Sequence, residues 1–471
     1  MGIFYLSFQR PPPLQVRPSE PVKVCVTITN DLRSETYTHP FEKTQPLRLR
    51  VAWVVLSPSG SVVRLEEEGE VGVDWRDGSC AFRVLEGLRA PSVRSVAVAT
   101  MNGKDEKGKG KGTLHLGVYV GPSTSARQIA KKSSPQDSHP LVWPLSPPSA
   151  PGADEADEFI PVLSGPIQLL ADSSHHGQQA GSKQNELLRT IRLPGSLATA
   201  RNLIIQEETG YELDKHIWDA SLHLLRLLTI PARIDSLPTS LRLLDRIASV
   251  AANEGRAFNV VELGAGTAVV SIALARWLEQ NPPPPNQPTE VPARVTFNAT
   301  DLDPALPIMD ANSRWNDLVT TEDAEQSSPS TGLGDSIPPP DDSAYASSAP
   351  LPSPLHPAQP RITLQPLVLD WTQPLPSALP HEIDLIMVSD CTYNPTFYPA
   401  LAQTILSLLT RSKASATCVL SKKHRHSDER GLWLILKGVG LDRRLVDGCE
   451  HQESDIGEEQ GWGTWEIFPI D

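Results

Sequence analysis

The stretch Val260-Val261-Glu262-Leu263-Gly264-Ala265-Gly266, "VVELGAG", places an acid and two glycines directly after a run of apolar residues. The run Asn259–Leu263 has the composition of a buried strand, and the apolar segment Thr267–Leu278 predicts a helix. Glycines let the main chain turn sharply and approach a ligand, and the start of a helix presents free N–H groups. The stretch therefore predicts a strand, a ligand-binding turn and a helix.

Further apolar runs of strand length follow, and helical segments separate several of them. The predicted strands are Val295–Thr300, Ile362–Leu369, Ile383–Val388 and Ala416–Leu420, and the predicted helices are Leu306–Asn316 and Tyr398–Leu409. Alternating strands and helices predict an α/β fold with a doubly wound, mostly parallel sheet. Ligands of such sheets bind at the carboxyl ends of the strands, so the residues after each strand are the candidates for a site.

The N-terminal region has a different pattern. Between Val22 and Val120, apolar and polar residues alternate in short runs, and turn signals such as Ser57-Pro58-Ser59-Gly60 separate these runs. A period of two predicts an antiparallel β-sandwich. The basic stretch Lys104–Gly112 has two interpretations, a solvated hairpin loop or a patch for nucleic acid, and its place between strands favours the loop.

Two tracts rich in proline and serine interrupt the chain. Residues 121–184 are interpreted as a linker and residues 320–360 as a disordered insertion, because structureless stretches of this length rarely belong to a compact core. We therefore expect a β-sandwich domain over residues 1–120. A second domain is expected over residues 185–471, and it contains the insertion.

Composition excludes several classes of protein. The net charge of -14 disfavours a large nucleic-acid surface, which needs concentrated positive charge. The five cysteines have no C-x-x-C spacing, which disfavours a disulfide framework or a zinc site. No apolar stretch approaches the ~20 residues of a transmembrane helix, and the N-terminus lacks the apolar core of a signal peptide. We expect a soluble protein of the cytoplasm, with the nucleus as a second location, and no nucleic-acid or membrane partner.

The turn after the first strand indicates a kind of ligand. A dinucleotide fingerprint has a third glycine where this chain has Val269, which disfavours a nicotinamide cofactor. Glu262 precedes the first glycine, and a carboxylate there suits a ligand with positive charge. The sulfonium and ammonium groups of S-adenosylmethionine have that charge, so the turn favours this cofactor.

Asp301 and Trp371 follow the second and third predicted strands. The carboxylate of Asp301 can accept both hydroxyls of a ribose. The alternative is an N-cap for the segment that starts at Pro304, and the glycine turn favours the ribose. The flat face of Trp371 can stack on an adenine, with a tryptophan of the core as the alternative.

The fourth strand is followed by Ser389-Asp390-Cys391-Thr392-Tyr393. Methyl transfer to an amine needs a neutral amine held in line with the methyl group, and Asp390 and Tyr393 can orient a lysine side chain and exclude water. Desolvation lowers the pKa of such an amine without a strong base. A nucleophilic Cys391 is the less favoured alternative, because the sequence places no histidine beside it.

Two segments flank these motifs. A predicted helix has an apolar face formed by Ile217, Leu224, Leu225 and Leu228, which leaves Trp218 and Asp219 available near the ligand. Residues 424–428, "HRHSD", allow a metal site, but a solvated loop or a substrate-facing edge is the favoured interpretation.

Together these motifs resemble the seven-β-strand, class I methyltransferases of the protein-lysine type, the methyltransferase-like family 16 group. The matching stretches are Trp218-Asp219-Ala220, Glu262-Leu263-Gly264-Ala265-Gly266-Thr267, Thr300-Asp301, Leu369-Asp370-Trp371 and Asp390-Cys391-Thr392-Tyr393, with Asn312 and Asn316 on the helix after the second strand. The resemblance covers about Asn185 to the C-terminus, and the preceding region resembles N-terminal regions of some fungal members. It implies a seven-stranded methyltransferase sheet and S-adenosyl-L-methionine as the cofactor.

The resemblance also implies roles for individual residues. The implied cofactor-binding residues are Trp218, Glu262, Gly264, Ala265, Gly266, Asp301, Trp371 and Ser389, and the implied catalytic residues are Asp390 and Tyr393 of the D-x-x-Y motif. Glu262 is expected to support the methionine end of the cofactor. The family usually has Gly-Ala-Gly-Thr-Gly at the turn, whereas this chain has Ala268 at the last position, where a methyl group crowds the turn or tightens its packing.

The predicted function is transfer of methyl groups from S-adenosylmethionine to lysine side chains of a protein, by a monomeric enzyme. The resemblance implies molecular chaperones, AAA ATPases or translation elongation factors as substrates, and the sequence does not choose among them. Two alternatives stay open. One is a methyltransferase of a non-lysine substrate, and the other is a non-catalytic interaction protein with a relic cofactor-binding domain.

Overall fold

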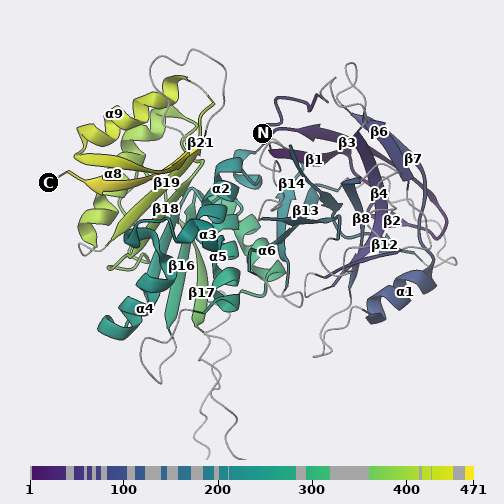
Figure 1. The fold of residues 1–471 in the computed structure, drawn as a ribbon. Coiled ribbons are helices and arrows are strands. Elements are labelled where there is room, and N and C mark those ends of the chain that lie inside the picture. Colours follow the sequence, from purple (N-terminus) through teal and green to yellow (C-terminus); the bar gives the residue numbers. More distant parts are fainter. Residues whose placement is uncertain are drawn as a thin grey trace, which may run out of the picture.

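The computed structural model of the chain has two parts, a β-sandwich drawn in purple and blue and an α/β unit drawn in teal to yellow, which lie side by side (Figure 1). The structure describes residues 3–38, 47–57, 61–65, 71–75, 82–102, 112–121, 139–145, 157–170, 184–195, 201–210, 212–282, 293–318, 360–412, 416–425, 427–448 and 462–470. The predicted loop at 104–112 and the predicted insertion at 320–360 lie outside these ranges, apart from Gly112 and Pro360. Within the ranges, no helix is long and apolar enough to cross a membrane.

Two sheets form the N-terminal part. The first has the strand order β10-β1-β3-β7, and the second has the order β14-β13-β11-β8-β4-β5, with β6 beside β4 and β9 beside β13. The bounds are β1 Ile3–Arg10, β3 Pro21–Thr29, β4 Leu47–Leu56, β5 Val62–Arg64, β6 Val71–Trp75, β7 Arg83–Arg89, β8 Thr113–Gly121, β9 Val142–Pro144, β10 Glu158–Ile160, β11 Val162–Ser164, β13 Glu186–Arg192 and β14 Leu203–Glu208. The short strands β2, Gln15–Val16, and β12, Gln168–Leu169, pair with each other.

Alternate residues of these strands fill the space between the two sheets. Val22, Val24 and Val26 of β3 are buried in the same hydrophobic core as Val51 and Trp53 of β4. The period of two along a strand puts such residues on one face, so the predicted β-sandwich is confirmed. Most of its strand pairs are antiparallel, but β1–β10, β9–β13 and β2–β12 are parallel.

The sandwich extends further along the chain than the sequence predicted. Strands β9 to β12 lie within residues 121–184, and β13 and β14 lie beyond residue 185 although they pair with sandwich strands. The linker prediction is therefore wrong where these strands form, and the first domain continues to Glu208. Strands β9 to β12 have only two or three residues each, too few to show an alternation in the sequence. Helix α1, Val93–Asn102, was not predicted either.

The second part contains a seven-stranded sheet with the order β17-β16-β15-β18-β19-β21-β20. Its strands are β15 Phe258–Leu263, β16 Arg294–Asp301, β17 Arg361–Val368, β18 Leu385–Ser389, β19 Thr417–Lys423, β20 Leu441–Gly448 and β21 Trp462–Pro469. Strands β15 to β19 are mutually parallel, and β21 is antiparallel to both of its neighbours. The predicted doubly wound, mostly parallel sheet is confirmed, and β15 to β19 coincide with the predicted strands.

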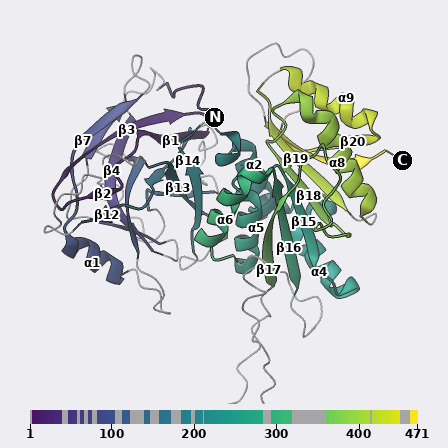
Figure 2. The same cartoon turned by 180° about the vertical axis from the view of Figure 1, so that it is seen from behind.

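Helices cover both faces of this sheet (Figure 2). They are α2 Asp219–Thr229, α3 Pro231–Ile234, α4 Leu243–Glu254, α5 Val269–Gln280, α6 Leu306–Trp315, α8 Tyr398–Arg411 and α9 Gly431–Gly438. Consecutive residues of β15 belong to different cores, since Val260 packs with α2, α4, α5 and α6 and Val261 packs with α8 and α9. Burial on both faces is why these strands are continuous apolar runs in the sequence.

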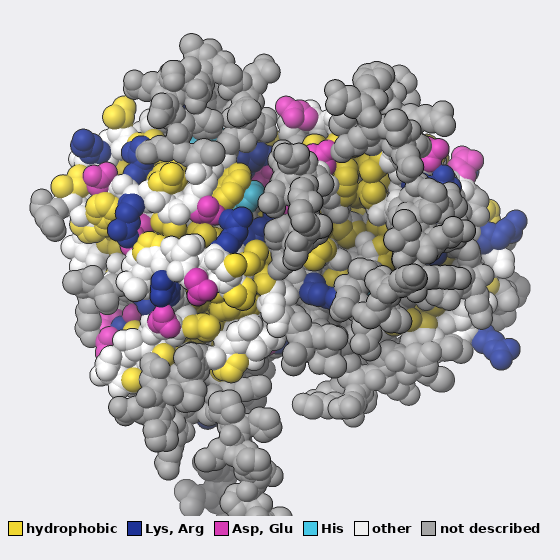
Figure 3. Space-filling model, viewed as in Figure 1, with side chains coloured by type: hydrophobic (Ala, Val, Ile, Leu, Met, Phe, Trp, Pro, Cys, Tyr) yellow, Lys and Arg dark blue, Asp and Glu magenta, His cyan; other side chains and the backbone are white. Residues whose placement is uncertain are grey.

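The two parts of the molecule share one hydrophobic core. It contains Ile3 and Tyr5 of β1 and Ile191 of β13 together with Leu222 and Leu225 of α2. On the outer face of the α/β part, basic side chains are interspersed with acidic ones (Figure 3). Apolar side chains are thus buried where the two parts meet, and the visible charges of that outer face are mixed.

Asn312 of α6 and Asn316, the C-cap of that helix, hydrogen-bond the edge of β14. Asn312 Oδ1 accepts the N–H of Gln206 at 2.6 Å, and Asn316 Oδ1 accepts the N–H of Ile204 at 3.1 Å. Their amide groups donate back to the carbonyl oxygens of the same two residues. The backbone groups of an edge strand need partners, so these contacts join the sandwich to the α/β part. Asn312 Nδ2 also donates to the carbonyl oxygen of Thr267 at 3.0 Å, next to the glycine turn.

Candidate active site

Four parallel strands end at one edge of the seven-stranded sheet. Leu263 at the end of β15 is in register with Thr300 of β16 and with Val388 of β18, and Asp301 is in register with Val368 of β17. Each strand therefore delivers the residues that follow it to the same rim. This is where ligands of doubly wound sheets bind.

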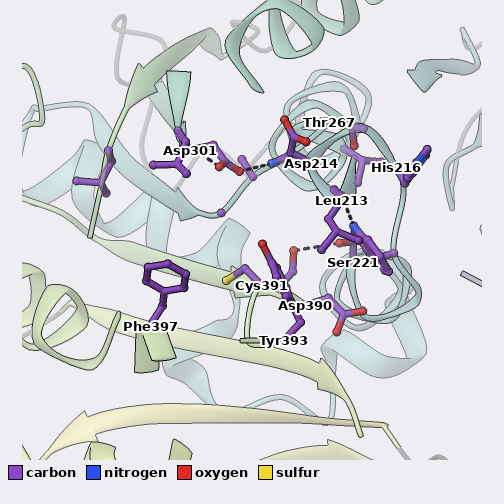
Figure 4. Close-up of a pocket in the computed structure, with 18 of the residues that line it drawn as sticks. Leu213, Asp214, His216, Ser221, Thr267, Asp301, Asp390, Cys391, Tyr393 and Phe397 are labelled. Carbon is purple, nitrogen blue, oxygen red and sulfur yellow. Dashed lines mark hydrogen bonds between the residues drawn. The ribbon is translucent and has the colours of Figure 1, made fainter. Parts of the chain in front are cut away.

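A pocket lies at this rim, and its empty volume of about 860 Å³ includes the open solvent at its mouth. Nearly all of the predicted site residues line it: Trp218, Gly264, Ala265, Gly266, Asp301, Trp371, Ser389, Asp390 and Tyr393. In Figure 4, Asp301 and Thr267 lie across the pocket from Asp390, Cys391 and Tyr393. The structure thus brings together residues that are widely separated in the sequence.

The glycine turn forms one wall of the pocket. Gly264 and Gly266 have φ angles of 65° and 53°, in the left-handed region where glycine carries no penalty. A Cβ atom on Gly264 would lie 2.5 Å from Cβ of Cys391 and 3.4 Å from the ring of Trp371. The missing side chain therefore lets Cys391 pack directly against the turn.

Asp301 accepts two backbone N–H groups, from Gly266 to Oδ2 at 2.8 Å and from Leu302 to Oδ1 at 2.7 Å. Leu302 occupies the N-cap of the short helix Asp303–Ala305, so the N-cap interpretation of Asp301 is wrong. Burial raises the pKa of the Asp301 carboxyl group, although both N–H bonds oppose that shift. The carboxylate keeps free lone pairs at the pocket and can accept ribose hydroxyls.

Glu262 does not line the pocket, and its support of the methionine end of the cofactor stays a prediction. Its side chain is buried behind the turn, where Oε2 accepts the N–H of Ser271 at 3.1 Å and its hydroxyl at 2.5 Å. Burial raises the pKa of Glu262 to about 7. Glu262 therefore holds the first turn of α5 against β15 and positions the glycine turn from behind.

Two tryptophans flank the pocket. Trp371 is half-buried: it packs at the margin of a hydrophobic core and also lines the pocket, and stacking on an adenine stays a prediction. Trp218 precedes α2, and its Nε1 donates to the carbonyl oxygen of Leu213 at 3.0 Å. Both rings present aromatic surface to the pocket.

The D-x-x-Y motif lies on the opposite wall. Asp390 has a left-handed backbone with φ of 55°, and its carboxylate is buried. Arg425 donates to both of its oxygens, Nη1 to Oδ1 and Nη2 to Oδ2, each at 2.6 Å. Tyr393 is 56% exposed at the pocket mouth, and the Ser389 hydroxyl pairs with that of Ser221 at 3.0 Å. The Asp390 carboxylate at the pocket wall is thus already paired with one cation, the guanidinium of Arg425.

The interpretation of Cys391 as a nucleophile loses support, whereas His426 of the stretch 424–428 lies outside the described residues. Burial raises the pKa of the Cys391 thiol well above its usual value, and its Sγ faces the carbonyl oxygen of Leu263 at 3.5 Å, so it is not a thiolate nucleophile. Among the described residues, no cluster of histidine, cysteine and carboxylate side chains is arranged to hold a metal ion.

The sequence did not reveal several residues of the site. Leu213, Asp214 and His216 line the pocket from the segment before α2, where no motif marks them. His216 accepts a hydrogen bond from Arg33 Nη2 at Nδ1, 3.0 Å away, and its Nε2 donates to the carbonyl oxygen of Gly210 at 3.1 Å. Burial lowers the pKa of His216, so a neutral ring with the proton on Nε2 fits both contacts.

Comparison with known proteins finds a family match. Residues 198–328 and 356–436, less than half of the chain, match the model of a family described as lysine methyltransferase. This region of the chain resembles that family. A calmodulin-lysine N-methyltransferase of Arabidopsis thaliana is 30% identical over 109 residues, which are 22% of this chain and 36% of that relative. The chain thus matches about a third of the length of this curated relative.

Solved structures with a similar arrangement include two methyltransferases. One is a TehB-like SAM-dependent methyltransferase from Corynebacterium glutamicum, with 11% identity, a TM-score of 0.25 and coverage of 48% of this chain and 87% of that chain. The other is the glycopeptide N-methyltransferase MtfA in complex with sinefungin, with 10% identity, a TM-score of 0.24 and the same coverage of both chains.

The cofactor of the lysine methyltransferase family, S-adenosyl-L-methionine, fits the residues of this pocket. The glycine turn lines the pocket with backbone that carries no bulky side chain, and Asp301 offers carboxylate acceptors at the rim. Trp371 offers an aromatic face for a purine. The residues that would hold the cofactor are Trp218, Gly264, Ala265, Gly266, Asp301, Trp371 and Ser389.

Proposed function

We propose that the chain transfers methyl groups from S-adenosylmethionine to lysine side chains of a protein substrate. One observation carries this proposal: a single pocket contains Asp301 and Trp371, which suit the cofactor, and Asp390 and Tyr393 of the D-x-x-Y motif. A donor and an acceptor held in one cavity react without the entropic cost of meeting in solution. The family description and the lysine specificity in the name of the Arabidopsis relative support lysine as the acceptor.

The residues of the pocket wall serve a direct displacement. When bound, S-adenosylmethionine supplies an electrophilic methyl group on a sulfonium. The lone pair of a neutral lysine amine forms the new N–C bond as the C–S bond breaks, and the surplus proton leaves to water. Asp390 accepts a hydrogen bond from the amine and fixes its direction.

The ion pair of Asp390 with Arg425 suits this role. A lone carboxylate beside a lysine amine favours the protonated, unreactive form. The guanidinium 2.6 Å from each carboxylate oxygen offsets that charge. Asp390 can therefore orient the amine without keeping it protonated.

The mouth of the pocket suits the stem of a lysine. Tyr393 and Phe397 line the pocket and are 56% and 44% exposed. Lysine buries its methylene groups along such apolar surfaces while its amine reaches a polar partner. The two rings therefore favour a side chain that enters from a protein surface.

The test is a methyl-transfer assay with labelled S-adenosylmethionine on cell extract, followed by mass spectrometry of the labelled band. The expected result is label on a protein lysine with the wild-type chain, and a loss of about 100-fold or more with Asp390→Asn. Titration with S-adenosylhomocysteine serves as the folding control for both proteins. Label on another residue type or on a small molecule contradicts the lysine assignment. Absence of label from a wild-type chain that binds S-adenosylhomocysteine contradicts the activity.

A further inference from the structure

A turn of the N-terminal sandwich lies behind the wall of the pocket, where it contacts Arg425. The turn Asn30–Glu35 follows β3 and is held by its own hydrogen bonds, among them the N–H groups of Ser34 and Glu35 to Oδ1 of Asn30 at 3.1 and 3.3 Å. The N–H of Asn30 also donates to the carbonyl oxygen of Glu35 at 3.0 Å. Such a network fixes the side chain of Asp31, which is 5% exposed.

Asp31 contacts two cations of the α/β part. Arg425 Nη2 donates to Asp31 Oδ2 at 2.6 Å, and Lys423 Nζ lies 3.5 Å from Oδ1. The N–H of Leu32 donates to Oδ1 at 3.0 Å, and the N–H of Asp219 to Oδ2 at 3.4 Å. Asp31 is therefore a buried carboxylate with both oxygens engaged across the boundary between the two parts.

Arg425 connects Asp31 to the pocket. The same guanidinium that binds Asp31 donates to both oxygens of Asp390 and lies 5.5 Å from the ring centre of Trp218. Two carboxylates from different parts of the fold thus hold one planar cation. A planar fork held on both sides fixes the direction of each partner more tightly than a single contact does.

We propose that Asp31 of the N-terminal sandwich is a positioning residue for methyl transfer, which acts by holding Arg425 in the orientation that fixes the Asp390 carboxylate beside the target amine. This inference rests on the proposed function of the pocket. Asp31 itself touches neither the cofactor nor the amine, so its effect passes through Arg425.

The backbone conformation of Asp390 explains why Arg425, its side-chain partner, must itself be held in place by Asp31. A non-glycine residue in the left-handed region is strained, and the surroundings must hold it there. The N–H of Asp390 donates to the carbonyl oxygen of Ser421 at 2.9 Å. Its Oδ1 accepts the N–H of Lys423 at 3.4 Å, but its two shortest side-chain contacts are those with Arg425. If Arg425 loses Asp31, its long side chain regains rotational freedom and Asp390 loses its fixed direction.

The isosteric substitution Asp31→Asn leaves the charges of the surrounding cluster balanced. Lys423 also binds Oδ2 of Asp219 at 2.6 Å, and Tyr5 donates to Oδ1 of Asp219 at 2.9 Å. Three carboxylates, of Asp31, Asp219 and Asp390, therefore surround the two cations Lys423 and Arg425. Replacing Asp31 by asparagine leaves two acids for two cations, so no charge in the cluster is left without a counterpart.

The chain provides a matched control in Glu158 of β10. Its Oε2 accepts from Arg226 Nη2 of α2 at 2.6 Å, so Glu158 is also an acid of the sandwich paired with an arginine of the α/β part. Neither residue lines the pocket. Glu158→Gln therefore removes a comparable contact between the two parts without touching Asp390.

The test compares Asp31→Asn with Glu158→Gln in the full-length chain. We expect Asp31→Asn to lower kcat about tenfold or more, as misplacement of an orienting group does, while S-adenosylhomocysteine binds within about twofold of wild type. Glu158→Gln is expected to keep kcat within about twofold of wild type, even if its melting temperature falls as far as that of Asp31→Asn. In an Arg425→Gln background, Asp31→Asn is expected to have no further effect on kcat, because its action passes through Arg425. An unchanged kcat in Asp31→Asn, equal losses in both single variants, or full additivity with Arg425→Gln would overturn the proposal.

A measurement without catalysis separates this inference from the proposed function. Amide hydrogen exchange over residues 389–394 is expected to be faster in Asp31→Asn than in wild type, and unchanged in Glu158→Gln. If the wild-type chain transfers no methyl group, the proposed function fails while the exchange result still decides whether Asp31 fixes this segment. Equal exchange in all three proteins contradicts the positioning role.

Discussion

The backbone N–H of Gly266 donates to Oδ2 of Asp301 at 2.8 Å, so the glycine turn after β15 and the carboxylate after β16 form one unit. Asp301→Ala removes the acceptor for ribose hydroxyls and the anchor of the turn. A hydrogen bond to a charged group contributes about 1.5–3 kcal/mol, so we expect S-adenosylhomocysteine to bind about 10- to 100-fold more weakly. Isothermal titration measures this change.

Asp303→Ala is the control for Asp301→Ala, because Asp303 is an exposed aspartate two residues away that does not line the pocket. We expect Asp303→Ala to bind S-adenosylhomocysteine as tightly as wild type does. Equal binding by Asp301→Ala and wild type would remove Asp301 from the cofactor site.

Tyr393 is expected to act through its ring rather than its hydroxyl. It stands 56% exposed at the pocket mouth, where its aromatic face can pack along the methylene stem of a lysine. Tyr393→Phe should keep kcat/KM within about threefold, whereas Tyr393→Ala should lower it by about 10-fold or more through lost orientation. The measurement is the labelled methyl-transfer assay, and a Phe variant as weak as the Ala variant would assign the role to the hydroxyl.

Glu262 is expected to make stability depend on pH. Its pKa is raised to about 7 by burial, from an ordinary value of 4.5, so the fold favours the protonated form. The stability from this group is complete below pH 4.5 and is lost as the pH rises to about 7, a change of about 3 kcal/mol. Glu262→Gln carries no ionisable group and keeps an acceptor for Ser271, so it should gain stability over wild type as the pH rises.

Urea unfolding of both proteins without cofactor, at pH 5 and pH 8, measures this difference. Other titrating groups act equally in the two proteins and cancel in the comparison. A constant difference between variant and wild type across this range would show that Glu262 is already ionised in the fold.

Ala268 has a φ of 57° at the position where the family usually has glycine. Relief of a left-handed alanine is worth about 1–2 kcal/mol, and Ala268→Gly loses about 0.8 kcal/mol of buried methyl and about 0.5–1 kcal/mol through a more flexible unfolded chain. We expect these effects to cancel within about 1 kcal/mol.

Ala273→Gly is the matched control, since Ala273 is equally buried but lies within α5. It has no strain to relieve and should lose about 2 kcal/mol through helix propensity and burial. Thermal unfolding compares the two variants. An equally large loss in both would mean that the turn tolerates alanine without strain.

Local sequence patterns predicted the strands and the turn that build the pocket. They could not predict contacts between residues far apart in the chain. The apolar runs of β15 to β19 and the glycine turn are signals within a few residues, so Asp301, Trp371 and Asp390 could be placed at strand ends. Asp31 and Arg425 are 394 positions apart in the chain, and nothing near either residue marks the other as its partner. The strands of two or three residues in the predicted linker gave no period to detect.

The direction of the Glu262 side chain could not be predicted from the sequence motif. The acid before the glycines was assigned to the ligand because its charge suits a cation. The structure turns the side chain to Ser271, behind the turn. A motif fixes the residue type and its place on the strand, but the direction of the side chain depends on packing against α5.

The structure of the chain in complex with S-adenosylhomocysteine is the most direct test of whether one pocket holds the cofactor beside the D-x-x-Y motif. We expect the purine against Trp371, the ribose hydroxyls on Asp301 and the sulfur facing the wall formed by Asp390 and Tyr393. A nucleoside bound away from these residues, or with its sulfur turned from Asp390, would contradict it.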